Sequence, residues 1–152
     1  IIYITIYILM NLGFFSCLLM LKRNNVYYEK IDDLAGLSKN HPLLSLSFLI
    51  IMFSLAGIPP LAGFFAKFYI FKAVIEESMY FLAIVGLLST VVAAFYYLRI
   101  IKIIYFDKEK EKYDIDHGLW LKFSLTSSTL FILMYFVFPS KLIEIISKIN
   151  II

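Results

Sequence analysis

The sequence predicts an all-α membrane protein with four transmembrane helices, one of which is interrupted inside the membrane. Of its 152 residues, 62% are hydrophobic and only 16% are charged. The apolar residues form blocks of about 20, which is the length of helix that crosses the hydrocarbon layer of a bilayer. The net charge of +3 comes from Lys and Arg between these blocks, where such residues set orientation, and it indicates no nucleic-acid partner.

The predicted transmembrane segments are separated by charged stretches and make one membrane domain over residues 1–152. Their approximate bounds are 1–21, 42–76, 78–101 and 119–138. The first segment ends at Lys22 and the last opens with Trp120, which are residue types typical of the boundary between lipid and water. The tail, 140–152, is expected to form an amphipathic helix on the membrane surface.

The second segment is too long to be one straight helix across a membrane. Its 35 residues, from Pro42 to Glu76, would extend about 52 Å at 1.5 Å per residue, against about 30 Å of hydrocarbon. Prolines remove backbone donors and clash with the preceding turn, so they interrupt helices. Either two short spans turn back here as a hairpin, or one span is discontinuous. The residues that mark the break are Gly57, Pro59, Pro60 and Gly63.

The charges of the loops decide between the hairpin and the discontinuous span. With one discontinuous span, ten Lys and Arg side chains face one side of the membrane and three face the other; with a hairpin the numbers become seven and six. The positive-inside rule favours the larger imbalance. The sequence therefore predicts a single broken span, with its basic loops facing the cytoplasm or matrix. The ten are Lys22, Arg23, Lys30, Lys39, Arg99, Lys102, Lys108, Lys110, Lys112 and Lys122.

Lys67 is the strongest candidate for a functional residue. It lies among aromatic residues in the long apolar stretch, and placing a lysine at the centre of a membrane costs about 2.5–3.5 kcal/mol. We therefore expect it to face a water-filled cavity or a carboxylate. The helix break supplies unpaired carbonyls near Ser54 to Ala56 that can hold an ammonium group. Such a lysine can change its protonation when a neighbouring charge moves.

Other polar residues have simpler explanations. Glu76 and Glu77 fall at the end of the second segment, where carboxylates are solvated, and His41 stands at a helix start. The single cysteine, Cys17, lies in an apolar run and offers no disulfide or thiol cluster. We predict no metal site. One charged loop contains three residues of types that bind metals, but the sequence offers no second pair of ligands to complete a site. These residues are Asp114, Asp116 and His117.

Three stretches resemble a known protein family. They are Asp33-Leu34-Ala35-Gly36-Leu37 with His41-Pro42, the segment 53–69 around the break, and Tyr96-Tyr97-Leu98-Arg99. They are similar to the carboxyl-terminal region of subunit N of respiratory complex I, which is NADH dehydrogenase subunit 2 in mitochondria. This subunit is one of the antiporter-like proton-translocating subunits. The resemblance covers residues 1–106, and from Asp107 onward only the hydropathy matches.

The resemblance implies a fourteen-helix antiporter-like fold, of which this chain would hold the last four helices. Lys67 would be the protonatable lysine of the twelfth helix, on the exit side of the proton route. Related subunits carry glutamate here or an acidic residue next, whereas Phe68 and Tyr69 follow Lys67, which favours subunit N. The chain begins without Met inside an apolar segment, so we expect a companion chain or a longer protein to supply the earlier helices.

The same resemblance implies a membrane-arm subunit of the proton-translocating NADH:quinone oxidoreductase. NADH, FMN, iron–sulfur clusters and quinone would bind partner subunits, and this chain would hold no cofactor. Its partners would be other complex I membrane subunits and membrane lipid. The resemblance implies the mitochondrial inner membrane, with the bacterial plasma membrane as the alternative, and the bias toward Ile, Lys, Asn, Phe and Tyr is typical of an AT-rich genome such as that of an organelle or an endosymbiont. A sodium/proton antiporter subunit and a structural membrane subunit remain open.

Overall fold

The protein is mostly helical, as the sequence predicts. The structure, a computed structural model, describes residues 2–23, 26–27, 30–108, 114–115 and 118–137. The long helices are α1 (Ile2–Met20), α3 (Pro42–Ala56), α4 (Ala62–Glu76), α5 (Tyr80–Phe106) and α6 (Leu119–Val137). The short elements are the 3₁₀ helix η1 (Ile31–Leu34), helix α2 (Leu37–Asn40) and the strands β1 (Leu21–Arg23), β2 (Val26–Tyr27) and β3 (Asp114–Ile115).

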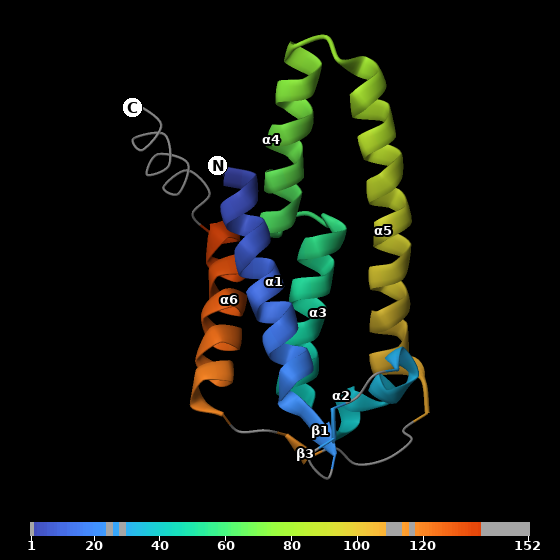
Figure 1. Cartoon of the computed structure of the whole chain (residues 1–152), viewed down its shortest axis with the longest axis vertical. Coiled ribbons are helices and arrows are strands. Elements are labelled where there is room, and N and C mark those ends of the chain that lie inside the picture. Colours follow the sequence, from blue (N-terminus) through green and yellow to red (C-terminus); the bar gives the residue numbers. More distant parts are fainter. Residues whose placement is uncertain (1, 24–25, 28–29, 109–113, 116–117, 138–152) are drawn as a thin grey trace.

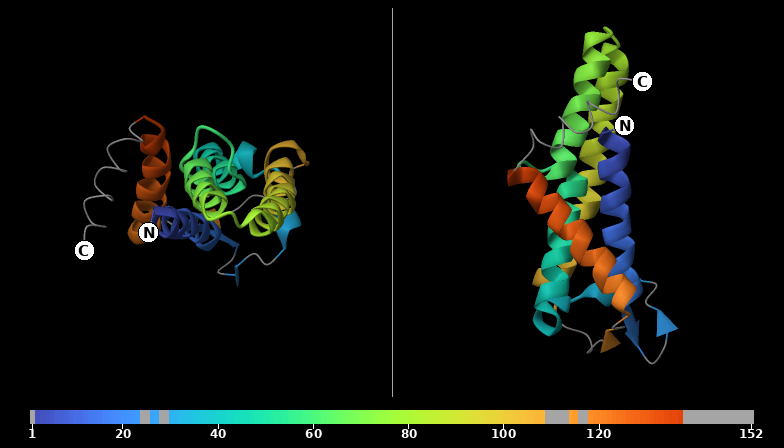
Figure 2. Two further views of the ribbon diagram at one scale, coloured as in Figure 1. Left: turned by 90° about the horizontal axis from the view of Figure 1, so that it is seen from above. Right: turned by 90° about the vertical axis from the view of Figure 1, so that its left-hand side faces the viewer.

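The long helices form an up-and-down bundle (Figure 1). Helix α1 runs toward the end that carries the strands, α3 and α4 run away from it one after the other, α5 returns, and α6 runs away again. Seen from above, α6 and α1 lie on one side, α3 and α4 in the middle, and α5 on the far side (Figure 2). Helix α4 thus continues the direction of α3 and does not fold back, which is the geometry of the discontinuous span and not of the hairpin.

Helix α1 is the central packing partner of α6 and α3. A Cβ atom at Gly13 would lie 2.8 Å from Ser128 Cβ of α6 and 2.9 Å from Ile51 Cδ1 of α3, so only glycine lets the three helices approach this closely. The hydroxyl of Ser16 donates to the Leu12 carbonyl of its own helix at 2.6 Å and is hydrogen-bonded to the Ser124 hydroxyl of α6 at 2.8 Å. Small residues and hydroxyl contacts therefore join α1 to α6, as is usual between membrane helices.

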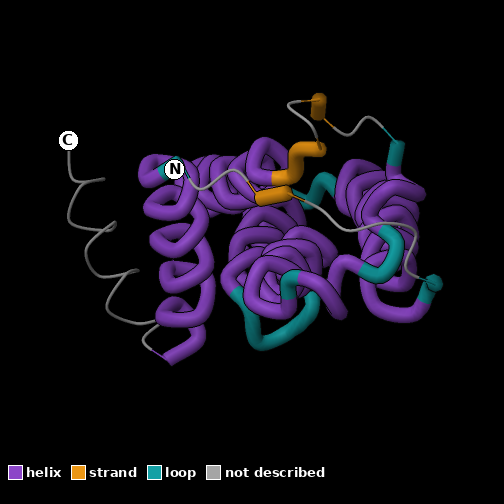
Figure 3. The backbone as a smooth tube through the Cα atoms, turned by 90° about the horizontal axis from the view of Figure 1, so that it is seen from below, coloured by secondary structure: helices purple, strands orange, loops and turns teal. Residues whose placement is uncertain are grey.

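The end of the bundle next to α2 is closed by elements that the sequence did not predict. Strand β1 pairs antiparallel with β2 and with β3, giving a three-stranded sheet in the order β2-β1-β3. Figure 3 shows the strands gathered at this end. In the segment before Pro42, Leu34 and Leu37 are buried, and the Gly36 amide donates to the Ile103 carbonyl of α5 at 3.3 Å.

Helix lengths and exposure suit a membrane. Among the described residues, α1 and α5 are each long and apolar enough to cross a bilayer, while α3 and α6 are shorter apolar helices. The outward side of α5 exposes large apolar side chains, including Phe81 at 81% and Val91 at 68%. Helix α5 is also longer than the predicted third segment, since it ends at Phe106 and not near residue 101. The predicted tail helix, 140–152, lies outside the described residues.

Candidate functional site

The predicted interruption is present between α3 and α4, where residues 57–61 leave the helical conformation. Gly57 adopts a left-handed conformation with φ 83°. Its amide donates to the Ser54 carbonyl at 3.0 Å, and the Ile58 amide donates to the Phe53 carbonyl at 3.0 Å. This pair of bonds is the Schellman pattern, which ends a helix and satisfies two of its last four carbonyls. Pro59 cannot contribute a further amide donor to the end of α3.

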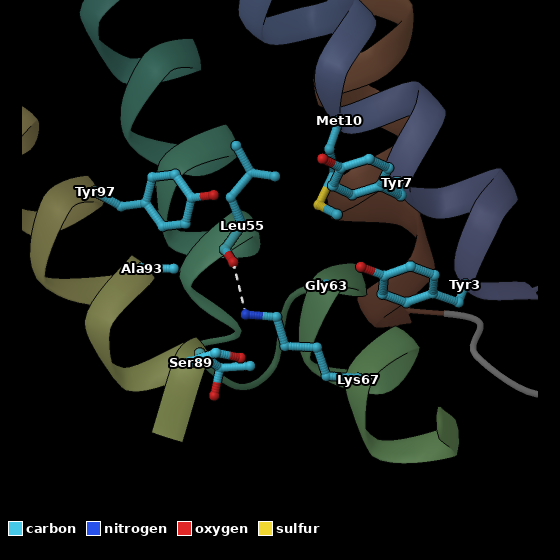
Figure 4. A pocket seen from close by; sticks show the side chains of 10 residues that line it. Tyr3, Tyr7, Met10, Leu55, Gly63, Lys67, Ser89, Ala93 and Tyr97 are labelled. Carbon is cyan, nitrogen blue, oxygen red and sulfur yellow. Dashed lines mark hydrogen bonds between the residues drawn. The ribbon is translucent and has the colours of Figure 1, made fainter. Parts of the chain in front are cut away.

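The remaining carbonyls at the end of α3 accept hydrogen bonds from Lys67. Its ammonium nitrogen lies 2.9 Å from the Leu55 oxygen and 3.3 Å from the Ala56 oxygen. Lys67 stands in the second turn of α4, and its side chain reaches back across the break (Figure 4). The carboxyl end of a helix carries a partial negative charge, which favours a cation at this position. The ammonium therefore caps α3 at the carbonyls that the sequence predicted near Ser54 to Ala56.

Gly57 also makes room for this contact. A Cβ atom there would lie 3.1 Å from Lys67 Cδ and 3.4 Å from Lys67 Nζ. A side chain at this position would thus press on the lysine in addition to straining a backbone with positive φ. Gly57 therefore has two roles: it ends α3, and it leaves space for the Lys67 side chain to reach the carbonyls of α3.

The two half-helices are joined by Ser54. Its buried hydroxyl accepts a hydrogen bond from the Gly63 amide at 3.0 Å and donates to the Met10 sulfur on α1 at 3.0 Å. A Cβ atom at Gly63 would overlap the Ser54 carbonyl. The first turn of α4 can therefore lie beside the last turn of α3 only because residue 63 has no side chain, and Ser54 ties this crossing to α1.

Two cavities meet at Lys67. The first, which we call the tyrosine-lined cavity, has a volume of about 210 Å³ and is lined by Tyr3, Tyr7, Met10, Leu55, Gly63, Lys67, Ser89, Thr90, Ala93 and Tyr97. The second, the apolar cavity, has a volume of about 310 Å³ and is lined by Tyr3, Lys67, Ile70, Phe71, Val74, Leu82, Gly86, Ser89 and Thr90. On α5, the lining of the first cavity reaches Tyr97, toward the α2 end of that helix, and the lining of the second reaches Leu82, toward the opposite end.

Among the described residues, Lys67 has backbone carbonyls as its partners and no carboxylate. Ion pairs within the described ranges include Lys72 with Glu76 at 3.7 Å and Lys102 with Asp107 at 2.8 Å, both away from Lys67. The sequence left open whether a cavity or a carboxylate would accompany Lys67. In the described part of the chain, it is accompanied by cavities.

Comparison with known proteins identifies the family. The family model described as NADH:quinone oxidoreductase/Mrp antiporter, TM, matches residues 1–93, which include α1, α3, the break and α4. The chain belongs to this family. Lys67 and the residues of the break thus all lie within the part of the chain that the family model covers.

Individual family members extend the match beyond residue 93. The chain is 80% identical over all 152 residues to NADH-quinone oxidoreductase subunit N of Pelagibacter ubique, and it covers 32% of that protein. It is 50% identical over 142 residues to NADH-quinone oxidoreductase subunit N of Parvibaculum lavamentivorans, and covers 29% of it. The chain therefore spans about a third of the length of these relatives. The similarity continues past Asp107, where the sequence alone gave only a match of hydropathy.

A solved structure of the family supports the same fold. A chain of the respiratory complex I from Thermus thermophilus with bound aureothin superposes with a TM-score of 0.77 at 27% identity, over 91% of this chain and 31% of that one. These relatives are bacterial. They support the bacterial alternative for the membrane location and give no support to the mitochondrial reading.

The remaining candidate residues lie apart from Lys67. Glu76 pairs with Lys72 near the end of α4, and Glu77 is exposed just beyond it. His41 stands at the amino end of α3, opposite the break. Asp114 lies in strand β3, whereas two residues of the proposed ligand loop, Asp116 and His117, are outside the described residues. The described part of the chain contains no group of three or more His, Cys, Asp or Glu that could hold a metal ion.

Sequence reasoning missed the residues that surround Lys67 from other helices. Ser54 was noted only for its carbonyl, and its hydroxyl bridge was not foreseen. Tyr3 and Tyr7 were assigned to an apolar span without a role, although both side chains line the tyrosine-lined cavity beside Lys67. Their spacing of four residues is the only signal in the sequence, since it places both side chains on one side of a helix.

Proposed function

We propose that this chain is the carboxyl-terminal third of a proton-translocating membrane subunit of a bacterial NADH:quinone oxidoreductase, and that Lys67 carries the translocated proton. The observation that supports this role is the contact of the Lys67 ammonium with the Leu55 and Ala56 carbonyls beside two cavities. The identity to NADH-quinone oxidoreductase subunit N over the whole chain supports the assignment to this complex.

The carbonyls allow the lysine to hold a proton without a permanent counter-ion. Two carbonyls and the helix dipole stabilise the ammonium form, and each of them carries only a partial negative charge. A charge that moves nearby in the assembled complex then changes the balance between the two forms. A proton leaves Lys67 for water in an adjoining cavity when a positive charge approaches, and returns when it withdraws.

The proposed arrangement in the membrane has four crossings. These are α1, the broken pair α3 and α4, α5, and α6, which alternate in direction (Figure 1). The end of the bundle with α2 and the strands carries most of the basic residues and faces the cytoplasm by the positive-inside rule. This orientation places the apolar cavity toward the outside and the tyrosine-lined cavity toward the cytoplasm.

The redox chemistry belongs to other subunits in this proposal. NADH, FMN, iron–sulfur clusters and quinone bind to those partners, and this chain contributes no redox centre. The earlier helices of the subunit come from a preceding part of the same protein or from a companion chain. Contacts with neighbouring membrane subunits and with lipid cover the exposed apolar side of α5, where Phe81 and Val91 lie.

The first test replaces Lys67 in the full-length subunit within the assembled complex. Lys67→Met should leave the complex intact but abolish or strongly reduce the number of protons pumped for each NADH oxidised, because the side chain can no longer take up a proton. Lys72→Met is the matched control, since Lys72 lies on the same helix with its side chain exposed and paired with Glu76. Undiminished pumping by Lys67→Met would overturn the proposal, whatever the control does.

A sodium/proton antiporter subunit is the second candidate, because the family description includes the Mrp antiporters. It predicts sodium-dependent proton flux in vesicles without NADH. A purely structural role for Lys67 makes a third, opposite prediction: Lys67→Met would reduce the amount of assembled complex before it changes proton flux. A native gel stained for NADH dehydrogenase activity, with this chain detected by antibody, separates the first two candidates.

A further inference from the structure

Three phenol groups converge on the cavity beside Lys67. Tyr3 and Tyr7 come from α1, and their rings stack with centroids 5.7 Å apart and planes 9° from parallel. Tyr97 comes from α5 and lines the opposite wall of the same cavity. Figure 4 shows the three hydroxyl groups directed into the space in front of the Leu55 carbonyl and the Lys67 ammonium.

These hydroxyls make no hydrogen bond to the described residues of the chain. Tyr7 is 45% exposed and Tyr3 is part-buried, so both hydroxyls can reach water where the space beside them is polar and large enough. The tyrosine-lined cavity, with about 210 Å³ and several hydroxyl groups on its walls, meets both conditions. The cavity can therefore hold water molecules within reach of Tyr3 and Tyr7.

The lysine faces the same cavity. A protonated lysine has three N–H donors, of which two are directed to the Leu55 and Ala56 carbonyls. The third remains for the cavity. Ser89 and Thr90 on α5 already donate their hydroxyl protons to carbonyls of their own helix, at 2.7 Å each. They can accept a hydrogen bond but have no proton left to pass on, which leaves the tyrosines as the side chains able both to accept and to donate.

We propose that Tyr3 and Tyr7 of α1 are proton-transfer residues for Lys67, organising a chain of water molecules through the tyrosine-lined cavity. This inference rests on the proposed function of Lys67. In each transfer the phenol oxygen accepts a proton from one water molecule while its own hydroxyl proton passes to the next, so the tyrosine stays neutral. The last water gives its proton to the neutral Lys67 amine, which becomes the ammonium held by α3. No oxidant, reductant or tyrosinate takes part.

A packing role for the rings makes a different prediction from a role for the hydroxyls. Phenylalanine keeps the ring and removes only the hydroxyl, so Tyr3→Phe, Tyr7→Phe and the double variant separate the two. The matched control is Tyr96→Phe, because Tyr96 is exposed at 55% and lies outside both cavities. All variants are made in the full-length subunit within the assembled complex, and assembly is measured on a native gel.

The expected result is a severalfold fall in the rate of proton pumping for the double variant, a smaller fall for each single variant, and no change for Tyr96→Phe. The solvent deuterium isotope effect on pumping should increase in the double variant, because proton transfer becomes more rate-limiting; a loss of packing alone would not change it. Should the double variant fail to assemble, the single Tyr7→Phe variant gives the same test. Pumping and isotope effects equal to those of Tyr96→Phe in an assembled complex overturn the proposal.

The two proposals fail in different ways. If Lys67→Met abolishes pumping while the tyrosine variants pump normally, Lys67 keeps its role and the water chain reaches it without Tyr3 and Tyr7. If Lys67→Met pumps normally, the proposed function itself is wrong, and the inference about the tyrosines falls with it.

Discussion

The broken pair α3 and α4 and the continuous helix α5 lie side by side but differ in how their polar groups are hydrogen-bonded. Helix α5 runs for 27 residues, and its hydroxyls at Ser89 and Thr90 bond to carbonyls of their own helix. Helix α3 ends after 15 residues and leaves carbonyls that Lys67 satisfies from the next helix. The charge thus lies where the backbone offers unpaired acceptors, which is how a lysine is stabilised among apolar helices.

The substitution with the largest expected effect is at the crossing of α3 and α4, where it should reduce the amount of assembled complex more than a comparable substitution on α5. Gly63→Ala forces a Cβ atom into the Ser54 carbonyl, and overpacking of a buried site costs about 1–3 kcal/mol, with a backbone clash at the upper end. We expect little assembled complex on a native gel. Gly86→Ala is the control on α5, since its Cβ would lie 2.8 Å from Phe71 Cε1, which is the far end of a side chain that can shift. Equal yields of the two variants would show that the crossing is not tight.

Loss of the Ser54 hydroxyl should have the next largest effect. Ser54→Ala leaves the buried Gly63 amide without its acceptor, which costs about 1–3 kcal/mol. The half-life of activity on heating should shorten. Ser89→Ala removes a hydroxyl from the continuous helix, where the carbonyl keeps its helical partner, and should change stability by less than about 0.5 kcal/mol. If Ser89→Ala shortened the half-life more than Ser54→Ala, the proposed difference between the broken pair and the continuous helix would be contradicted.

A smaller effect is expected at the end of α3. Gly57→Ala places a side chain at φ 83°, which costs about 1–2 kcal/mol, and brings its Cβ within 3.1 Å of Lys67 Cδ. Pumping should fall more than stability, because the lysine side chain is displaced from its carbonyls. Gly57→Asn, which tolerates the left-handed conformation better, keeps more of the stability but still crowds Lys67. The pumping rate and the heat-inactivation rate of both variants measure the two effects.

The sequence predicted the features that depend on neighbouring residues. Proline chemistry predicted a break at Pro59 and Pro60, and the carbonyls that such a break leaves unpaired were expected to be able to hold an ammonium group; α3 does end at Ala56, and Lys67 bonds to the last two carbonyls. The positive-inside rule favoured the discontinuous span, and α4 does continue the direction of α3. The break could be predicted because consecutive prolines interrupt a helix whatever surrounds them, and the direction of α4 could be predicted because the loop charges of the whole chain favour one orientation.

The features that depend on contacts between helices could not be predicted. The helices are apolar on all sides, so no periodic pattern shows that Tyr3 and Tyr7 face Lys67 and not lipid. The Ser54 hydroxyl bridges three helices, and one of its partners is 44 residues away. The sheet of β1, β2 and β3 joins two loops that are separated by three long helices. Such pairings require the three-dimensional arrangement.

The central claim is that Lys67 must release its proton and not only cap α3. Lys67→Arg tests it most directly, because an arginine donates to the same carbonyls but remains protonated in proteins. Proton pumping for each NADH oxidised is measured in vesicles that contain the assembled complex. The account predicts normal assembly with pumping abolished or strongly reduced. Pumping at the level of the unmodified complex would contradict it and leave Lys67 with a structural role alone.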